Sequence, residues 1–224
     1  MPSMVTVLIP AHNEEKYIFE TIRAVSRIPN VQEILVVDDA SEDATAAKAS
    51  MAGARVLTLP VNQGKGGALN EGLNHISGDF IAVVDGDLGD SAGELSKLIF
   101  PVINDVADMT IARFPEAQSK GGFGLVRGLA RRGIKNFAGI EVKSPLSGQR
   151  VLKRAVIDTL GGFETGFGVE VAMTIDAVRK GFRILEVDVN MTHAESGRNI
   201  SGFLHRGKQF IDVAKALARR AGSR

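Results

Sequence analysis

The chain has 224 residues, 44% of them hydrophobic and 24% charged, which is the balance of a folded globular protein rather than a disordered one. Its lack of cysteine excludes disulfide bonds, thiolate metal sites and a cysteine nucleophile. The first residues carry no signal-peptide pattern, and no apolar run approaches the ~18 residues that a membrane-spanning helix needs. We therefore expect a single cytoplasmic domain over residues 1–224.

The net charge of +1 is a cancellation between two halves of opposite sign. Residues 1–112 carry 7 Lys and Arg against 16 Asp and Glu, whereas residues 113–224 carry 20 against 10. An asymmetry of this kind predicts a charged ligand or partner for each half.

The first half alternates short apolar runs with helical patterns. Strands are expected at 5–10, 33–39, 54–60 and 79–87, and helices at 14–28, 43–52 and 66–76. Runs of β-branched and apolar residues between helices of this length predict an α/β fold with parallel strands buried on both faces. Ligands of such sheets bind beyond the carboxyl ends of the strands.

The second half continues with a strand at 107–115 and a mobile loop leading into an amphipathic helix within 116–139. Further helices are expected after the loops that begin at 144 and 161, followed by a strand within 182–195. A basic amphipathic helix closes the chain at 200–221. Such a helix either packs on its own domain or lies on anionic lipid at the inner face of a membrane.

Paired carboxylates follow the fourth predicted strand, at Asp85 and Asp87. Two carboxylates spaced by one residue can bind one Mg²⁺ or Mn²⁺ together with ligand phosphates, although an Asp-Gly pair also makes a plain turn. Asp38 and Asp39 end the second strand, where one of them either accepts a hydrogen bond from a nucleoside or serves the next helix as a cap.

Lys65 stands in the glycine-rich segment Asn62 to Gly67, at the start of a predicted helix. Backbone N–H groups and an ammonium at such a place form a site for a phosphate, whereas the structural alternative is a flexible turn with a solvated lysine. The segment lacks the spacing and the Ser or Thr of a P-loop.

The segments VLIPAHNEE, VVDDASED, NQGKGGALNEG and VVDGD, in this order and at these spacings, resemble GT-A glycosyltransferases. The similarity is to family 2 enzymes such as dolichol-phosphate mannose synthase and also to the glucosyl-3-phosphoglycerate synthases. It implies a mainly parallel, Rossmann-like mixed sheet and a nucleotide-diphospho-sugar donor carrying UDP or GDP. It places Pro10, Ala11, Glu14 and Asp38 or Asp39 around the nucleoside, Lys65 and Gly66 near the base or phosphate, and Asp85 and Asp87 on the metal.

The same resemblance suggests roles for three residues of the second half. His193, which otherwise reads as a solvated loop residue, matches a third metal ligand, and Arg198 matches a group that grips a phosphate. Glu170 is either a first-turn helix acid or the group that deprotonates or orients the acceptor. Family 2 similarity favours inversion at the anomeric carbon, whereas Lys65 and His193 resemble a retaining group.

The segment Ser144 to Arg150 falls between the acceptor loops of the two groups. Gln149 stands where the dolichol-phosphate enzymes have an aromatic residue, which argues against lipid phosphate as the acceptor. Seven basic residues of the second half are candidates to surround an anionic acceptor: Arg127, Arg131, Arg132, Lys135, Arg150, Lys153 and Arg154.

These features predict a metal-dependent hexosyltransferase that moves a sugar to an anionic small molecule or a polyprenyl phosphate. The alternatives are a sugar-phosphate nucleotidylyltransferase, which would need a glycine-rich loop where Pro10 to Glu14 stand, and a non-catalytic nucleotide-binding module. We expect no nucleic-acid partner, whereas peripheral membrane contact through the basic helix and a homodimer are both compatible with the sequence.

Overall fold

The computed structural model describes residues 4–114, 123–164, 166, 168–192 and 200–221, and for residues 123 and 200–209 the backbone alone. Seven strands form one sheet: β1 (Val5–Ala11), β2 (Val31–Asp38), β3 (Arg55–Thr58), β4 (Phe80–Val83), β5 (Met109–Arg113), β6 (Arg150–Lys153) and β7 (Ile184–Asp188). The helices are α1 (Ile18–Ser26), α2 (Thr45–Met51), α3 (Gly64–Leu73), η1 (Gly89–Glu94), α4 (Leu95–Ile103), α5 (Phe123–Ala138), α6 (Arg154–Leu160), α7 (Val169–Arg179) and α8 (Ile200–Ala221).

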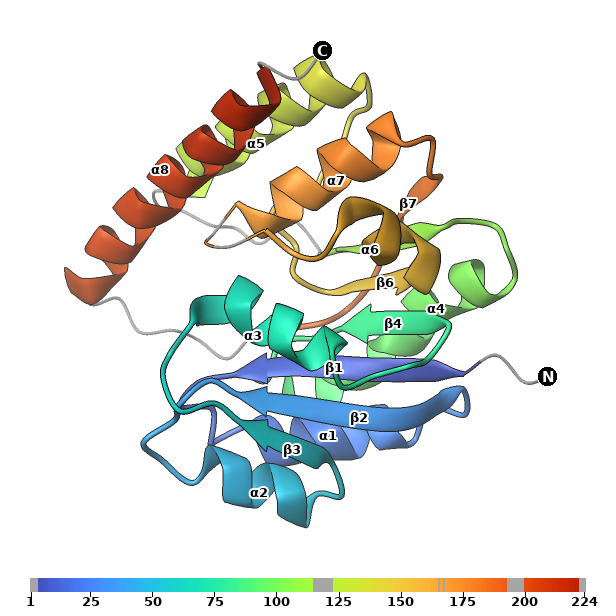
Figure 1. Ribbon diagram of the computed structural model, residues 1–224, viewed down its shortest axis with the longest axis vertical. Helices are drawn as coiled ribbons and strands as arrows, with labels where there is room; N and C mark the ends of the chain where they lie inside the picture. The colour runs from blue at the N-terminus through green and yellow to red at the C-terminus, as the bar shows by residue number, and fades with distance from the viewer. Residues whose placement is uncertain (1–3, 115–122, 165, 167, 193–199, 222–224) are drawn as a thin grey trace.

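The sheet has the order β3-β2-β1-β4-β6-β5-β7 (Figure 1). All neighbouring pairs are parallel except those of β6, which runs antiparallel to both β4 and β5. This is the mixed, mainly parallel sheet that the sequence predicts. The strand order reverses direction between β1 and β4, so their carboxyl ends form a topological switch point, where ligands of open α/β sheets bind.

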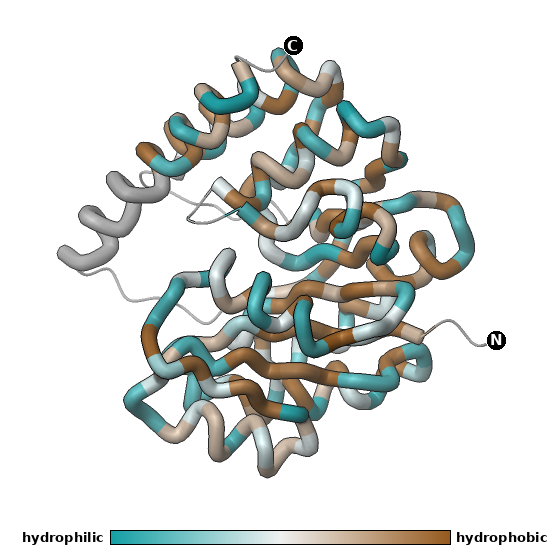
Figure 2. The backbone as a smooth tube through the Cα atoms, in the orientation of Figure 1, coloured by the Kyte–Doolittle hydropathy of each residue, from teal (hydrophilic) through white to brown (hydrophobic). Residues whose placement is uncertain are grey.

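Alternate residues of each central strand enter different cores, because successive side chains of a strand point to opposite faces. In β1, Val7 and Ile9 pack with α1 and α4, whereas Leu8 packs with α3 on the other face. Figure 2 shows these inner strands as hydrophobic and the loops around them as largely hydrophilic. Burial on both faces explains why the strands read as continuous apolar runs.

The helices α5, α7 and α8 form a third packed group beside the sheet (Figure 1). The α8 side chains Val213 and Leu217 are buried against them, which confirms that the described part of this basic helix packs on its own domain. Phe210 and Ile211 of the same helix remain exposed. In the part of the chain that the structure describes, no helix is both long and apolar enough to cross a bilayer.

Two elements of the structure were not predicted. The helical segment of η1 and α4 contains Pro101, a residue that usually ends a helix and here stands in the last turn. The strand β6 has four residues and is followed directly by α6. In so short a run, the spacing of the hydrophobic residues does not distinguish a strand from a helix. The predicted helix over 200–221 is confirmed with the same bounds.

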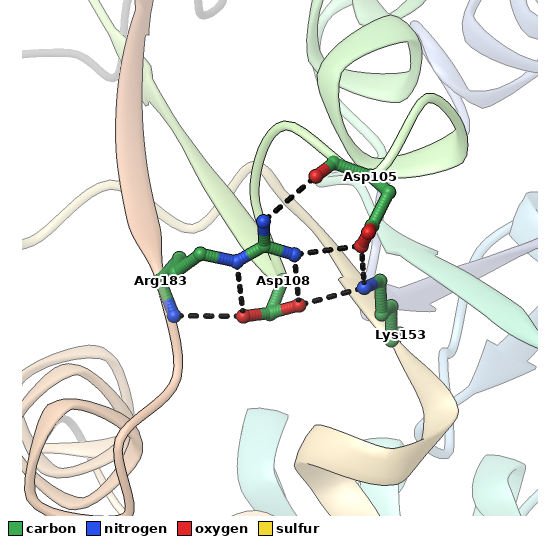
Figure 3. Close-up of polar contacts among 4 residues, drawn as sticks. All are labelled: Asp105, Asp108, Lys153 and Arg183. Atoms are coloured by element: carbon green, nitrogen blue, oxygen red, sulfur yellow. Dashed lines mark hydrogen bonds and ion pairs between the residues drawn. The ribbon is translucent and has the colours of Figure 1, made fainter.

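A network of four charged residues joins the edge of the sheet opposite the switch point (Figure 3). Asp108, which precedes β5, accepts hydrogen bonds from the Arg183 guanidinium at 2.9 and 3.0 Å and from Lys153 Nζ at 2.7 Å. Asp105 contacts the same two cations. The network connects the start of β5, the end of β6 and the residue before β7.

Candidate active site

The carboxyl ends of β1, β2, β3 and β4 lie side by side, because Asp38 pairs with both Ala11 and Thr58, and Leu8 pairs with Val83. The four sequence motifs at the ends of these strands therefore meet at one edge of the sheet. This confirms the expectation that the motifs, although dispersed along the chain, converge.

Hydrogen bonds of Thr21 in α1 fix the turn Asp85-Gly86-Asp87. The Thr21 hydroxyl donates to the Gly86 carbonyl at 2.9 Å and accepts from the Gly89 N–H at 2.8 Å. Gly86 is buried against Glu14, whose Cγ would lie 3.3 Å from an added Cβ. The turn is thus built into the fold, and its two carboxylates are partly exposed at the edge.

Lys65, in the first turn of α3, lies between two carboxylates. Its Nζ is 2.7 Å from Asp85 Oδ1 and 3.3 Å from Glu170 Oε1. Burial opposes the charged ammonium, but the charges of Asp85 and Glu170 outweigh it and raise the pKa of Lys65. A flexible turn with a solvated lysine is therefore excluded.

Glu170 reaches this cluster from the first turn of α7, with a side chain that is 12% exposed. Thr174, one turn further along α7, donates to the Glu170 carbonyl at 2.8 Å, and Arg150 Nη1 donates to the Thr174 hydroxyl at 2.9 Å. Lys65, Asp85 and Glu170 are far apart in the sequence, so their contact comes from the fold alone.

Asp38 and Asp39 are both buried and have different surroundings. The Asp39 carboxylate accepts the N–H groups of Gln63 and Gly64, at the N-terminus of α3, at 2.7 and 2.8 Å, so both of its oxygens have partners. Asp38 Oδ1 has no hydrogen-bond partner among the described residues. Because a buried acceptor without a partner is costly, Asp38 is the better candidate to bind a ligand N–H or hydroxyl.

The segment after β1 lies against the end of β2. His12 Nδ1 is 2.8 Å from the Asp39 carbonyl, and the Asn13 N–H donates to Ser41 Oγ at 2.9 Å. Asn13 has a φ of 58°, a left-handed conformation that asparagine tolerates. Pro10 and Ala11 pair with Val37 and Asp38 of β2, Glu14 lies three residues beyond Ala11, and Gly66 is buried in the first turn of α3.

Two predicted site residues, His193 and Arg198, lie outside the described residues. Among the residues that are described, no three His, Asp or Glu side chains gather as a metal site. Asp85 and Asp87 nevertheless fit a divalent cation, because Mg²⁺ is commonly bound by one or two carboxylates together with substrate phosphates. Asp85 is also paired with the Lys65 ammonium at 2.7 Å.

The basic residues predicted to surround an acceptor do not come together. Arg150 is 2% exposed, donates to the Ser147 carbonyl and faces no solvent; burial lowers its pKa to about 10 against the opposing influence of Glu170 and Glu186. Lys153 and Arg154 lie at the other end of β6, about 10 Å along a strand of this length. Arg154 there donates to the Gly78 and Ile76 carbonyls.

Four basic residues of α5 stay on the surface near the segment that leads to β6. Arg127 and Arg131 both donate to the Lys143 carbonyl, at 3.0 and 2.5 Å from Nη2, and Lys135 pairs with Glu141. Arg132 is exposed. Of the seven predicted cations, Arg127, Arg131 and Arg132 remain candidates to contact an acceptor.

Sequence reasoning missed two contacts of the site. The Gln149 amide donates to Asp85 Oδ2 at 2.6 Å, and a Cβ on Gly148 would lie 2.3 Å from Lys65 Nζ. Both residues precede β6, whose antiparallel course brings its first residue opposite Val83 of β4. No local pattern signals this placement.

The architecture and the paired carboxylates after β4 define a GT-A glycosyltransferase fold. The crystal structure of glucosyl-3-phosphoglycerate synthase from Mycobacterium tuberculosis with Mn²⁺, UDP-glucose and phosphoglyceric acid matches with a TM-score of 0.82 and 28% identity, covering 98% of this chain and 80% of that one. A structure of the same enzyme with Mg²⁺ and UDP matches with a TM-score of 0.79, 27% identity and the same coverage.

Comparison of amino-acid sequences gives the same class of protein as comparison of structures. The family described as glycosyl transferase family 2 matches residues 6–161, and the chain belongs to this family. An uncharacterized glycosyltransferase of Mycobacterium tuberculosis is 30% identical over 89% of this chain and 91% of its own length. The glucosyl-3-phosphoglycerate synthase of that organism is 31% identical over 77% of this chain, and glycosyltransferase AglJ of Haloferax volcanii is 27% identical over 81%. The chain spans 60% and 61% of the lengths of these last two relatives.

Proposed function

We propose that this chain is a metal-dependent glycosyltransferase that moves a sugar from a nucleotide-diphospho-sugar to an acceptor bearing a phosphate or carboxylate. The observation that carries the proposal is the cluster of Lys65, Asp85 and Glu170 at the switch point of the sheet. It joins a cation, a carboxylate suited to metal and a carboxylate suited to proton transfer within one site. The complexes of the solved relative with Mn²⁺, UDP-glucose and phosphoglyceric acid support it.

Asp38 and Lys65 bind different parts of the donor. The buried Asp38 Oδ1 accepts a hydrogen bond from the nucleoside, beside Pro10, Ala11 and Glu14. The diphosphate lies near Lys65 and the N-terminus of α3, where the ammonium and the helix dipole both favour negative charge. Gly66 lets the backbone approach the phosphates closely.

Asp85, Asp87 and His193 would hold Mg²⁺ or Mn²⁺, and Arg198 would add a contact to phosphate. When bound, the cation supplies Lewis-acid stabilisation for the negative charge of the departing nucleoside diphosphate. Asp85 and Asp87 are suited to that ion because both are hard oxygen ligands carried by a turn that Thr21 fixes.

Glu170 acts on the acceptor or the sugar. As a carboxylate within hydrogen-bond distance of an acceptor hydroxyl, it would take the proton as the new bond forms. If the acceptor oxygen is already a phosphate anion, Glu170 orients the sugar instead. Arg132, which is exposed, and the partly exposed Arg127 and Arg131 supply positive charge for an anionic acceptor.

The test is a panel of UDP- and GDP-sugars, each incubated with Mn²⁺ and either phosphoglyceric acid, a polyprenyl phosphate or no acceptor. We expect nucleoside diphosphate release that depends on an acceptor and on the metal. Release of pyrophosphate from a nucleoside triphosphate and a sugar phosphate would instead identify a nucleotidylyltransferase, and tight nucleotide binding without turnover a binding module. Proton NMR of the product then gives the anomeric configuration.

A further inference from the structure

The amide of Gln149 is buried against the carboxylate of Asp85. Gln149 is 0% exposed, its Nε2 donates to Asp85 Oδ2 at 2.6 Å, and its Oε1 accepts from Ser147 Oγ at 3.4 Å. Lys65 Nζ contacts the other oxygen of the same carboxylate at 2.7 Å. The two oxygens of Asp85 are therefore engaged from two sides, by a cation and by a neutral donor.

The backbone that carries Gln149 is fixed to the sheet. Its carbonyl accepts the Ala112 N–H of β5 at 3.0 Å, and the next residue, Arg150, pairs with Val83 of β4 and Ile111 of β5. Gly148 fits because it has no side chain: an added Cβ would lie 2.9 Å from Asp85 Oδ2. The amide donor is thus presented by a rigid element that touches the Asp85 turn directly.

We propose that Gln149 is a positioning residue that sets the orientation of the Asp85 carboxylate toward the divalent cation of the donor complex. The inference rests on the proposed function, since it needs a cation at Asp85. A hydrogen bond to one carboxylate oxygen fixes the rotamer of the ligand, while lone pairs remain for the ion. Loss of such outer partners typically lowers metal affinity or activity by about 10- to 100-fold.

If Gln149 served packing alone, a different result would be expected. If Gln149 only fills a buried space and satisfies its own amide, a side chain of similar volume without a donor changes stability and leaves metal binding unaltered. Gln149→Met is this variant. A matched control is Asn70→Leu, because the Asn70 amide is also partly buried and bonds the backbone of Phe163 at 2.7 and 2.8 Å, without contact to Asp85.

The experiment is a Mn²⁺ titration of the full chain in the presence of UDP, followed by electron paramagnetic resonance of the free ion, with thermal unfolding measured in parallel. We expect Gln149→Met to raise the dissociation constant of Mn²⁺ by about 10-fold or more. Asn70→Leu should lower the unfolding temperature and keep the wild-type dissociation constant. In turnover, Gln149→Met should need more Mn²⁺ for half-maximal rate, with most of kcat recovered at saturating metal.

The outcomes are distinguishable. If the wild type binds no Mn²⁺ even with UDP, the proposed function fails and the inference with it. If the wild type binds Mn²⁺ and folded Gln149→Met binds it equally well, or if Asn70→Leu weakens binding as much, the positioning role is overturned. Should Gln149→Met fail to fold, Gln149→Asn withdraws the donor by one methylene, and the same comparison decides.

Discussion

Asp85 lies at the centre of the site because its carboxylate contacts Lys65 and Gln149 and follows a strand that ends at the switch point. The charge of this side chain matters more than its shape for binding a cation. Replacing it by asparagine keeps the shape and removes the charge, so it separates a metal-binding role from a structural one.

Asp85→Asn should lower kcat/KM for sugar transfer by at least about 100-fold, since loss of a metal ligand costs more than loss of its outer partners. The unfolding temperature should stay within a few degrees of wild type. The assay is nucleoside diphosphate release with Mn²⁺, and Asp90→Asn, an exposed carboxylate three residues beyond Asp87, is the control that should retain activity. Near-normal turnover of Asp85→Asn would remove Asp85 from the metal site.

Asp38 and Asp39 are adjacent, and their carboxylates have different surroundings. Asp38→Asn should weaken nucleotide binding by about 10-fold or more, because a hydrogen bond to a charged group contributes about 1.5–3 kcal/mol. Its stability should be unchanged or higher, since the substitution removes a buried charge while keeping the shape of the side chain. Calorimetric titration with UDP and GDP measures the first effect, and an unchanged dissociation constant for both would exclude Asp38 from the nucleoside site.

Asp39→Ala is the complementary change. It removes the acceptor of two N–H groups at the start of α3, so it should destabilise the protein by about 1–3 kcal/mol, the cost of leaving a donor without its partner. Urea unfolding gives this value. A variant as stable as wild type would show that the Asp39 contact does not hold the start of α3.

At the scale of elements, α3 packs on the sheet through a glycine. A Cβ on Gly72 would lie 2.4 Å from Leu8 Cδ1 and 2.9 Å from Val37 Cγ2, and both neighbours are fully buried. This close approach positions the helix that carries Lys65. Helix propensity alone would favour alanine at this position by about 1 kcal/mol.

Gly72→Ala should nevertheless destabilise the protein, by a net of up to about 2 kcal/mol, because overpacking a core costs about 1–3 kcal/mol and the gain in helix propensity offsets about 1 kcal/mol of it. Gly128→Ala in α5 is the control: nothing lies within 4 Å of its added Cβ, so propensity should stabilise it by about 0.5–1 kcal/mol. Urea unfolding of both variants gives the comparison. Equal stabilisation by both would show that α3 moves away from the sheet at little cost.

The direction of β6 determines which of the residues around it lie at the site. Because it is antiparallel, its first residue lies at the carboxyl end of β4, and Gln149 reaches Asp85 while Lys153 lies at the opposite edge. A parallel strand in the same place would exchange these two ends.

At the scale of the whole molecule, Asp108, Lys153 and Arg183 hold the second part of the sheet together at the edge away from the site (Figure 3). Hydrogen bonds from Arg183, opposed by partial burial and reinforced by Lys153, hold the pKa of Asp108 well below its usual range. A carboxyl with a lowered pKa contributes stability that is complete above its unfolded value of about 3.9 and is lost as the pH falls toward the folded value.

Asp108→Asn should therefore be less stable than wild type at pH 7, and the difference should shrink at pH 3. Urea midpoints at the two pH values measure it. A difference that stays constant would mean that Asp108 acts through its hydrogen bonds alone and not through its charge.

The acidic and basic halves of the sequence are not separate in space. In the sheet, β6 of the basic half lies between β4 and β5 of the acidic half, and Glu170 of the basic half joins Lys65 and Asp85 of the acidic half. Several cations of the second half form ion pairs within the chain, such as those of Arg220 with Glu164 and Asp176. Fewer cations therefore remain at the surface of the second half than charge counting predicted.

The sequence by itself determined the α/β class, the alternation of strands and helices in the first half, and the edge of the sheet at which the motifs lie, and the motifs carried the resemblance to the family. The first three follow from local patterns, because hydrophobic period distinguishes strand from helix and parallel strands bring their carboxyl ends to one edge. Only the tertiary structure decided that Asp39 binds the start of α3 while Asp38 Oδ1 has no partner among the described residues, that Arg150 is buried, and that Gln149 and Glu170 meet Asp85 and Lys65. The physical reason is register: a shift of one residue reverses the face of every side chain in a strand, and no local pattern fixes the pairing of segments so far apart in the chain.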